Sequence, residues 1–169
     1  GPWLGLYDIS NGKAVMYCYI GLSAGDLLAG FLSQWWKSRK KVVQLYLWFS
    51  LAITLFFLVY MHNLNNSAAT YYLLCFLLGA GTGYWAIFVT IAAEQFGTNI
   101  RSTAANTIPN FVRGSVNVVV LLFSFLLSLQ FNEGWSALIV GVFFIGLALF
   151  SLSKLKETFG KDLDYFEVS

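Results

Sequence analysis

The sequence predicts an all-α protein in which a bundle of helices crosses a membrane several times. Of its 169 residues, 58% are hydrophobic and only 11% are charged, whereas a soluble domain carries roughly 25% charged residues. Five apolar stretches follow one another, each near or above the ~20 residues that cross ~30 Å of hydrocarbon. The connections between them are short and polar, as in HNLNNS and FNEG. These observations favour a polytopic transmembrane helix bundle without a soluble domain.

The expected elements follow in order along the chain. Residues 1–12, with Pro2 and three glycines, are expected to form a loop. Pro109 falls near the start of the fourth expected helix, where a proline is tolerated. The whole chain is expected to form a single transmembrane domain. The five expected helices cover residues 13–36, 42–61, 69–96, 106–131 and 135–153, and a polar tail covers residues 154–169.

The positive charges give the expected orientation of this bundle. If the helices alternate in direction, eight of the ten basic residues fall on one side of the membrane. Lysine and arginine are enriched in cytoplasmic loops, so this side is expected to face the cytoplasm. The chain would then be a multi-pass protein of the cell membrane, with a cytoplasmic C-terminus and the lipid bilayer around its outer surface. The eight residues are Lys37, Arg39, Lys40, Lys41, Arg101, Lys154, Lys156 and Lys161.

Several classes of function are disfavoured by the residues present. The formal net charge of +2 is too small to indicate a nucleic-acid partner. Cys18 and Cys75 both lie in apolar runs and are interpreted as packing residues, and the single histidine, His62, gives no metal cluster. We find no Ser/His/Asp set and no nucleophile paired with a base. No catalytic residue, metal or cofactor is therefore expected, and the chain is not expected to be an enzyme.

Small residues recur at near-helical spacing in the first and third expected helices. Gly21, Gly25 and Gly30 in the first helix, and Gly79 and Gly83 in the third, are expected to let neighbouring helices approach closely.

Asp26 lies within the first expected helix, two to three turns before its basic end. An acid inside a membrane span is a candidate functional residue. Two interpretations stay open: a polar group that bonds a neighbouring helix for packing, and a gating or coupling carboxylate.

A polar ladder occupies one face of the fourth expected helix. Asn106, Asn110, Arg113 and Asn117 are spaced by four, three and four residues, so they share a face. A guanidinium inside an apolar helix is costly unless it faces protein or water. Asn110, Arg113 and Asn117 are therefore candidate contacts for a polar or anionic solute in a water-filled cavity. The alternative is a hydrogen-bonded clasp between Arg113 and an acid such as Asp26.

Two aromatic residues of the third expected helix are further candidates for the cavity wall. Tyr84 and Trp85 follow Gly83 in the middle of that helix, where they can contact a solute. The alternative is that both rings pack against other helices or face lipid.

The segment that connects the first two expected helices holds the run Gly30 to Gln34, followed by the basic segment Lys37 to Lys41. This pattern is similar to Gly-x-Leu-Ala-Asp-Arg, a spacer and Gly-Arg-Arg/Lys, and it therefore resembles a loop motif of the major facilitator superfamily. Gln34 stands where the acid is usual and Trp35 where the arginine is usual, while the basic half is kept. This departure puts a charge-based latch at Gln34 itself in doubt.

Two further motifs resemble sugar-porter-like members of the same superfamily. Glu94 and Arg101, separated by six residues, resemble the acid-to-arginine motif that ends the fourth and tenth helices. The run Glu157 to Leu163 resembles the Pro-Glu-Thr-Lys-Gly-x-x-Leu tail, without its proline. The order of the three motifs implies that the five helices correspond to the eighth through twelfth of that fold, so that the seventh helix and the N-terminal half are missing.

The resemblance implies a function and a set of roles. The chain would be part of a secondary active transporter that moves a small polar solute, a sugar or an organic anion, by alternating access, with proton symport left open. The five helices alone are not expected to transport. The alternative is a non-transporting truncated membrane module or an assembly partner.

The same resemblance places Glu94 at the cytoplasmic rim, in contact with Arg101 and with Arg39 or Lys40. Such a cluster would hold a gate shut until the helices rock. The alternative is static ion pairing at the surface, which contributes ~0–1 kcal/mol. The helices at 13–36, 69–96 and 106–131 would line the cavity, and the other two would face lipid.

Overall fold

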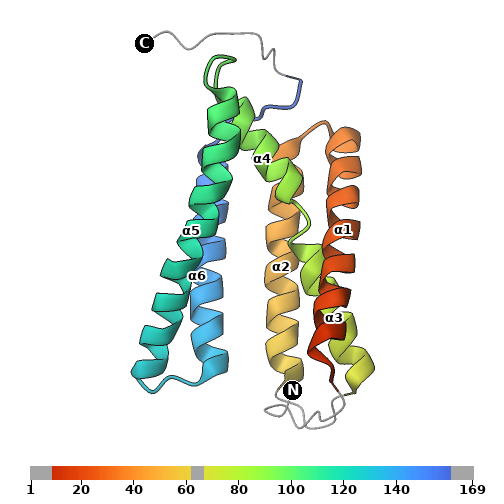
Figure 1. Ribbon diagram of the computed structural model, residues 1–169, viewed down its shortest axis with the longest axis vertical. Coiled ribbons are helices and arrows are strands. Elements are labelled where there is room, and N and C mark those ends of the chain that lie inside the picture. Colours follow the sequence, from red (N-terminus) through yellow and green to blue (C-terminus); the bar gives the residue numbers. More distant parts are fainter. Residues whose placement is uncertain (1–8, 62–66, 161–169) are drawn as a thin grey trace.

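The computed structural model describes residues 9–61 and 67–160, and this part of the chain is helical without strands (Figure 1). Five spans are long and apolar enough to cross a membrane, with α3 and α4 forming one of them together. The predicted class is confirmed: the chain is an all-α protein whose helices fit a multi-pass transmembrane bundle. The helices are α1 (Asn11–Trp36), α2 (Arg39–Met61), α3 (Ala68–Gly81), α4 (Trp85–Glu94), α5 (Arg101–Ser128) and α6 (Glu133–Lys154).

The predicted span at 69–96 is confirmed as Ala68–Glu94, but its continuity as one helix is wrong, because a turn at Thr82–Tyr84 divides it into α3 and α4. The backbone N–H of Thr82 donates to the carbonyl of Gly79 at 3.1 Å, and that of Gly83 donates to Ala80 at 3.0 Å. These bonds span three residues rather than four, so the last turn of α3 tightens and the helix ends. The break leaves the first N–H groups of α4 available near the middle of the span.

The predicted bounds of the fourth helix are also wrong, because α5 begins at Arg101 and ends at Ser128 rather than covering 106–131. The N–H of Arg101 donates to Gly97 at 3.0 Å, so the helix starts directly after a tight turn. Pro109 therefore lies well inside α5 instead of in its first turn. Residues 1–8 of the expected N-terminal loop, residues 62–66 and residues 161–163 of the tail motif fall outside the described residues.

Helices α1 and α3 approach so closely that their backbones touch at glycines. A Cβ on Gly79 would lie 2.0 Å from the carbonyl oxygen of Cys18, and one on Gly21 would lie 2.0 Å from that of Phe76. A Cβ on Gly83 would lie 2.5 Å from the backbone of Gly25. The predicted close packing is confirmed for these residues. It is wrong for Gly30, which has no neighbour within 4 Å.

The buried core gathers at one end of the bundle. Its residues come from the end of α1, the start of α2, the middle of α4 and the end of α6, which meet at the upper end of Figure 1. The core residues are Ala29, Val42, Val43, Tyr46, Leu47, Ile87, Ile91 and Leu152. We call this end, which also carries the basic loop between α1 and α2, the basic end.

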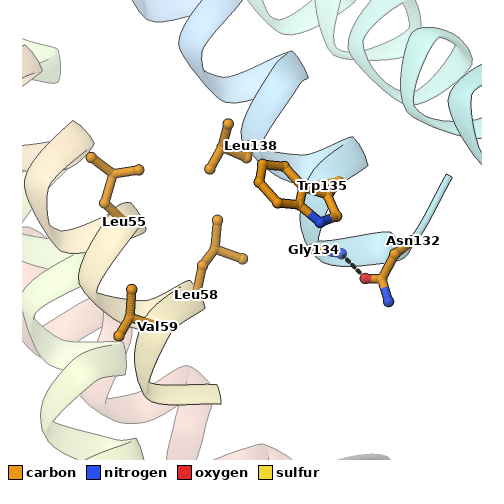
Figure 2. Close-up of a pocket in the computed structure, with 7 residues that line it drawn as sticks. All are labelled: Leu55, Leu58, Val59, Asn132, Gly134, Trp135 and Leu138. Carbon is orange, nitrogen blue, oxygen red and sulfur yellow. Dashed lines mark hydrogen bonds between the residues drawn. The ribbon is translucent and has the colours of Figure 1, made fainter. Parts of the chain in front are cut away.

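At the opposite end a gap separates α2 from α6. Figure 2 shows an apolar pocket of about 480 Å³ between α2 and α6, lined by Leu55, Leu58 and Leu138 and bounded by Trp135. Helix α5 packs on α4 and α6, and Pro109 is its one buried residue. The bundle is therefore closed at the basic end, and at the other end it is open between α2 and α6.

Candidate functional site

An ion pair joins the start of α2 to the end of α4 at the basic end. Arg39 Nη1 lies 2.5 Å from Glu94 Oε1, and the two side chains are 19% and 8% exposed. Within the described part of the chain, Arg39 Nη1 makes no hydrogen bond of ordinary geometry, so the contact is mainly a charge–charge one. Glu94 Oε2 is buried and has no hydrogen-bond partner among the same residues. A largely buried carboxylate depends on its cation, because an unpaired buried charge is costly.

The other two basic residues expected near Glu94 lie at the same end but make different contacts. Arg101 Nε donates to the carbonyl of Phe96 at 3.3 Å, within the turn that connects α4 to α5. The Lys40 ammonium contacts the carbonyl of Leu155, just after α6. Of the two candidates from the loop, Arg39 and Lys40, the structure brings Arg39 to Glu94.

Glu157, from the segment after α6, caps the start of α2. Its carboxylate accepts a hydrogen bond from the Ser38 hydroxyl, and it also accepts from the backbone N–H of Arg39 at 3.1 Å and of Lys40 at 3.3 Å. The first turn of α2 has no acid of its own. An acid at a helix N-terminus satisfies free N–H groups and complements the helix dipole. Glu157 supplies that charge from across the bundle.

The cap of Glu157 was missed by sequence reasoning, which treated the residue only as part of a tail motif. The missing acid in the first turn of α2 was the available signal. A further bond joins α4 to the same segment, because Gln95 Nε2 donates to the carbonyl of Lys156 at 3.1 Å. The three segments that carry the resemblance thus meet at the basic end.

The cap makes the segment after α6 sensitive to acid. Burial opposes the charged form of Glu157, but bonds from the Ser38 hydroxyl and from backbone N–H groups outweigh it and hold its pKa below the ordinary 4.5. A lowered folded pKa adds stability above the unfolded pKa, and this contribution is lost as pH falls through the folded pKa. We therefore expect the segment to detach only below the ordinary Glu range, which the Glu157 carboxyl carbon shift will report in a pH titration by NMR.

The matched variants of this titration differ in one hydroxyl. Ser38→Ala removes a donor to the carboxylate and is expected to raise the pKa of Glu157. Ser153→Ala removes a hydroxyl that bonds only within α6, to Phe150, and is expected to leave that pKa unchanged. A wild-type Glu157 that titrates at or above its ordinary value would contradict the cap.

Asp26 lies apart from the ion pair, at the break between α3 and α4. Its Oδ1 accepts a bond from the Ala86 N–H at 3.4 Å, in the first turn of α4. It sits ten residues, ~15 Å along the axis, before Trp36 at the end of α1. Asp26 was grouped with the gating residues, but its contact is with the start of α4 rather than with the basic end.

The polar face of α5 is exposed along the whole ladder, Asn106, Asn110, Arg113 and Asn117 included. Two of its amides bond back to their own helix: Asn106 Nδ2 to Ser102 at 2.9 Å, and Asn110 Nδ2 to Asn106 at 3.0 Å. The Arg113 guanidinium lies 5.4 Å from the ring centroid of Trp85, a cation–π contact. The alternative interpretation, a clasp between Arg113 and Asp26, is not formed among the described residues.

The structure separates the two aromatic candidates. Trp85 meets Arg113, as stated, whereas Tyr84 packs against the core, with its ring centroid 6.1 Å from that of Tyr46. Tyr46 in turn donates to the carbonyl of Gly25 at 2.7 Å. The packing interpretation therefore fits Tyr84, and the candidate solute contacts that the structure brings together from different helices are Trp85 and Arg113.

Comparisons of the chain with protein-family models, with curated proteins and with solved structures find no match. Within residues 9–61 and 67–160, no group of three or more His, Cys, Asp or Glu side chains could hold a metal ion. Two groups of residues are the candidates for function. One is the charged cluster at the basic end, formed by Arg39, Glu94 and Glu157, and the other is the polar face of α5.

Proposed function

We propose that this chain is part of a secondary active transporter of the major facilitator type, which moves a small polar solute by alternating access. One observation carries the proposal. The three segments that resemble that superfamily, far apart in sequence, are joined at the basic end by the Arg39–Glu94 ion pair and by the Glu157 cap on Ser38. In the proposal the chain lies in the cell membrane and this end faces the cytoplasm, as the positive charges favour.

The charged cluster would act as a latch. It ties α2, α4 and the segment after α6 together at the closed end, while α2 and α6 separate around the apolar pocket at the other end (Figure 2). The break at Thr82–Tyr84 gives α4 a point about which it can move relative to α3. Discontinuous helices and rocking bundles are how transporters expose one midplane site to each side in turn.

The polar face of α5 would meet the solute. Its Asn and Arg side chains are exposed, and an exposed guanidinium within a membrane span calls for water or a polar partner. Helices α2 and α6, with apolar middles, would face lipid in this arrangement.

The proposal is tested by solute flux in the native cells. We expect deletion of the native gene to remove most of the uptake or release of at least one small polar solute, when labelled metabolites are followed by mass spectrometry. The control strain carries Lys41→Gln, which removes an exposed charge outside the cluster and should keep wild-type flux. Equal flux of every solute with and without the gene would instead favour a non-transporting membrane module.

A further inference from the structure

We propose that the polar face of α5 binds an organic carboxylate, with Arg113 as its counter-ion and Trp85 as the surface that holds the guanidinium in place. The inference deepens the proposed function, on which it rests, by naming the class of solute. It separates an organic anion from a neutral sugar, the two solutes that the sequence left open.

The charge of Arg113 has no counter-ion in the part of the chain that the structure describes. Its contact there is the cation–π stack on Trp85, and Asp26, the acid within α1, bonds to the start of α4 instead. An arginine inside a membrane span is retained against a high cost and pairs with an anion or faces water. The positive charge of Arg113 therefore favours the binding of an anion at this face.

The neighbouring polar groups are arranged so that Arg113 supplies the donors. The amides of Asn106 and Asn110 each spend an N–H on a carbonyl of their own helix. Arg113 keeps a fork of N–H groups that matches both oxygens of a carboxylate. Stacking on Trp85 restricts the guanidinium before any ligand arrives, so less entropy is lost on binding.

A solute fits this face better than a fixed acidic side chain. The exposed polar stripe runs from Asn106 to Asn117, eleven residues or ~16 Å of helix, whereas one clasp between helices needs only one or two polar groups. Such a length suits a wall of a water-filled cavity. Over the same stretch the other faces of α5 expose apolar residues, Phe111, Val112 and Val116 among them, as do the positions just beyond Asn117, Val118, Val120 and Leu121.

The test is equilibrium binding to the purified chain in lipid nanodiscs. The probes are benzoate, its neutral isostere benzamide, and glucose as a neutral polyol, each followed by dialysis of the labelled compound. We expect benzoate to bind at least about tenfold more tightly than benzamide, and Arg113→Gln to remove this difference. Arg113→Lys should retain part of it, because the charge remains while the fork is lost.

The matched control is Lys154→Gln, which removes a lysine stacked on Phe150 at 5.6 Å near the end of α6, and it should leave benzoate binding unchanged. Equal binding of benzoate and benzamide, or benzoate binding that survives Arg113→Gln, would overturn the carboxylate. Absence of benzoate binding would overturn it as well. If benzoate fails these tests while glucose binds, the carboxylate inference is overturned but the transport proposal stands. The flux assay in native cells tests that proposal separately.

The amount of folded protein is a second readout, and it distinguishes solute binding by Arg113 from a structural role. If Arg113 pairs with an acidic side chain elsewhere in the assembled protein, Arg113→Gln will lower the amount of folded protein in native membranes. That loss would overturn the inference. We expect the amount to stay at the wild-type level.

Discussion

Alanine in place of Gly79 is expected to destabilise the bundle by about 3 kcal/mol or more, or to prevent folding. The added Cβ would lie 2.0 Å from the carbonyl oxygen of Cys18. The obstacle is backbone, so it cannot rotate away like a side chain, and the only relief is to move α1 off α3. That movement would also open the contact at Gly21 between the same two helices and the contact of α1 with Gly83, in the turn after α3. Unfolding in mixed micelles, followed by circular dichroism, will measure the loss.

The controls for this substitution are alanine substitutions at glycines that have open space around them. Gly141 and Gly146 on α6 have no neighbour within 4 Å, so alanine there meets nothing. Alanine is the better helix former by about 0.5–1 kcal/mol, so Gly141→Ala and Gly146→Ala are expected to be neutral or stabilising. If Gly79→Ala proves as mild as these two, α1 and α3 do not pack at backbone distance.

Removing one member of the Arg39–Glu94 pair is expected to have the second large effect on stability. Arg39→Gln leaves the Glu94 carboxylate unpaired in a site where its side chain is 8% exposed. We expect a loss of about 3 kcal/mol in the free energy of unfolding, because one partner of a buried pair has been stranded. Glu94→Gln should cost less, since the remaining Arg39 is 19% exposed and can reach water more readily.

The double variant separates pairing from other effects of the two substitutions. With both charges removed, neither is stranded, so the cost should be well below the sum of the two single losses. Lys41→Gln in the same loop should change stability by no more than about 0.5 kcal/mol, since Lys41 is exposed. Additive losses in the double variant would show that Arg39 and Glu94 do not act as a pair.

The spans could be predicted from the sequence because membrane-crossing length and apolar composition are local properties. The break in the third span was missed because Gly81, Thr82 and Gly83 were interpreted as part of an apolar helix, although two glycines around a threonine are a signal for a helix end. It depends on three-residue hydrogen bonds at Thr82 and Gly83, which require the folded backbone. The early start of α5 was missed for the opposite reason: its first turns are polar and were read as a loop.

The individual residues of the candidate site could be predicted from the sequence, but which of them contact one another could not. The polar face of α5 follows from helical spacing, but spacing within one helix does not reveal that Arg113 stacks on Trp85 rather than pairing with Asp26. The choice of Arg39 over Lys40 for Glu94 depends on how α2 begins, because Lys40 turns toward Leu155. Glu157 was missed because its partner, Ser38, is 119 residues away.

The central claim is that the basic end works as a latch in a transporter, and a charge exchange tests it most directly. Solute flux is measured in native cells that carry Arg39→Glu, Glu94→Arg or both, with membrane levels of the protein matched. Each single variant places two like charges together and should lose most of the flux, while the exchanged pair should regain part of it. Wild-type flux in both single variants would contradict the latch.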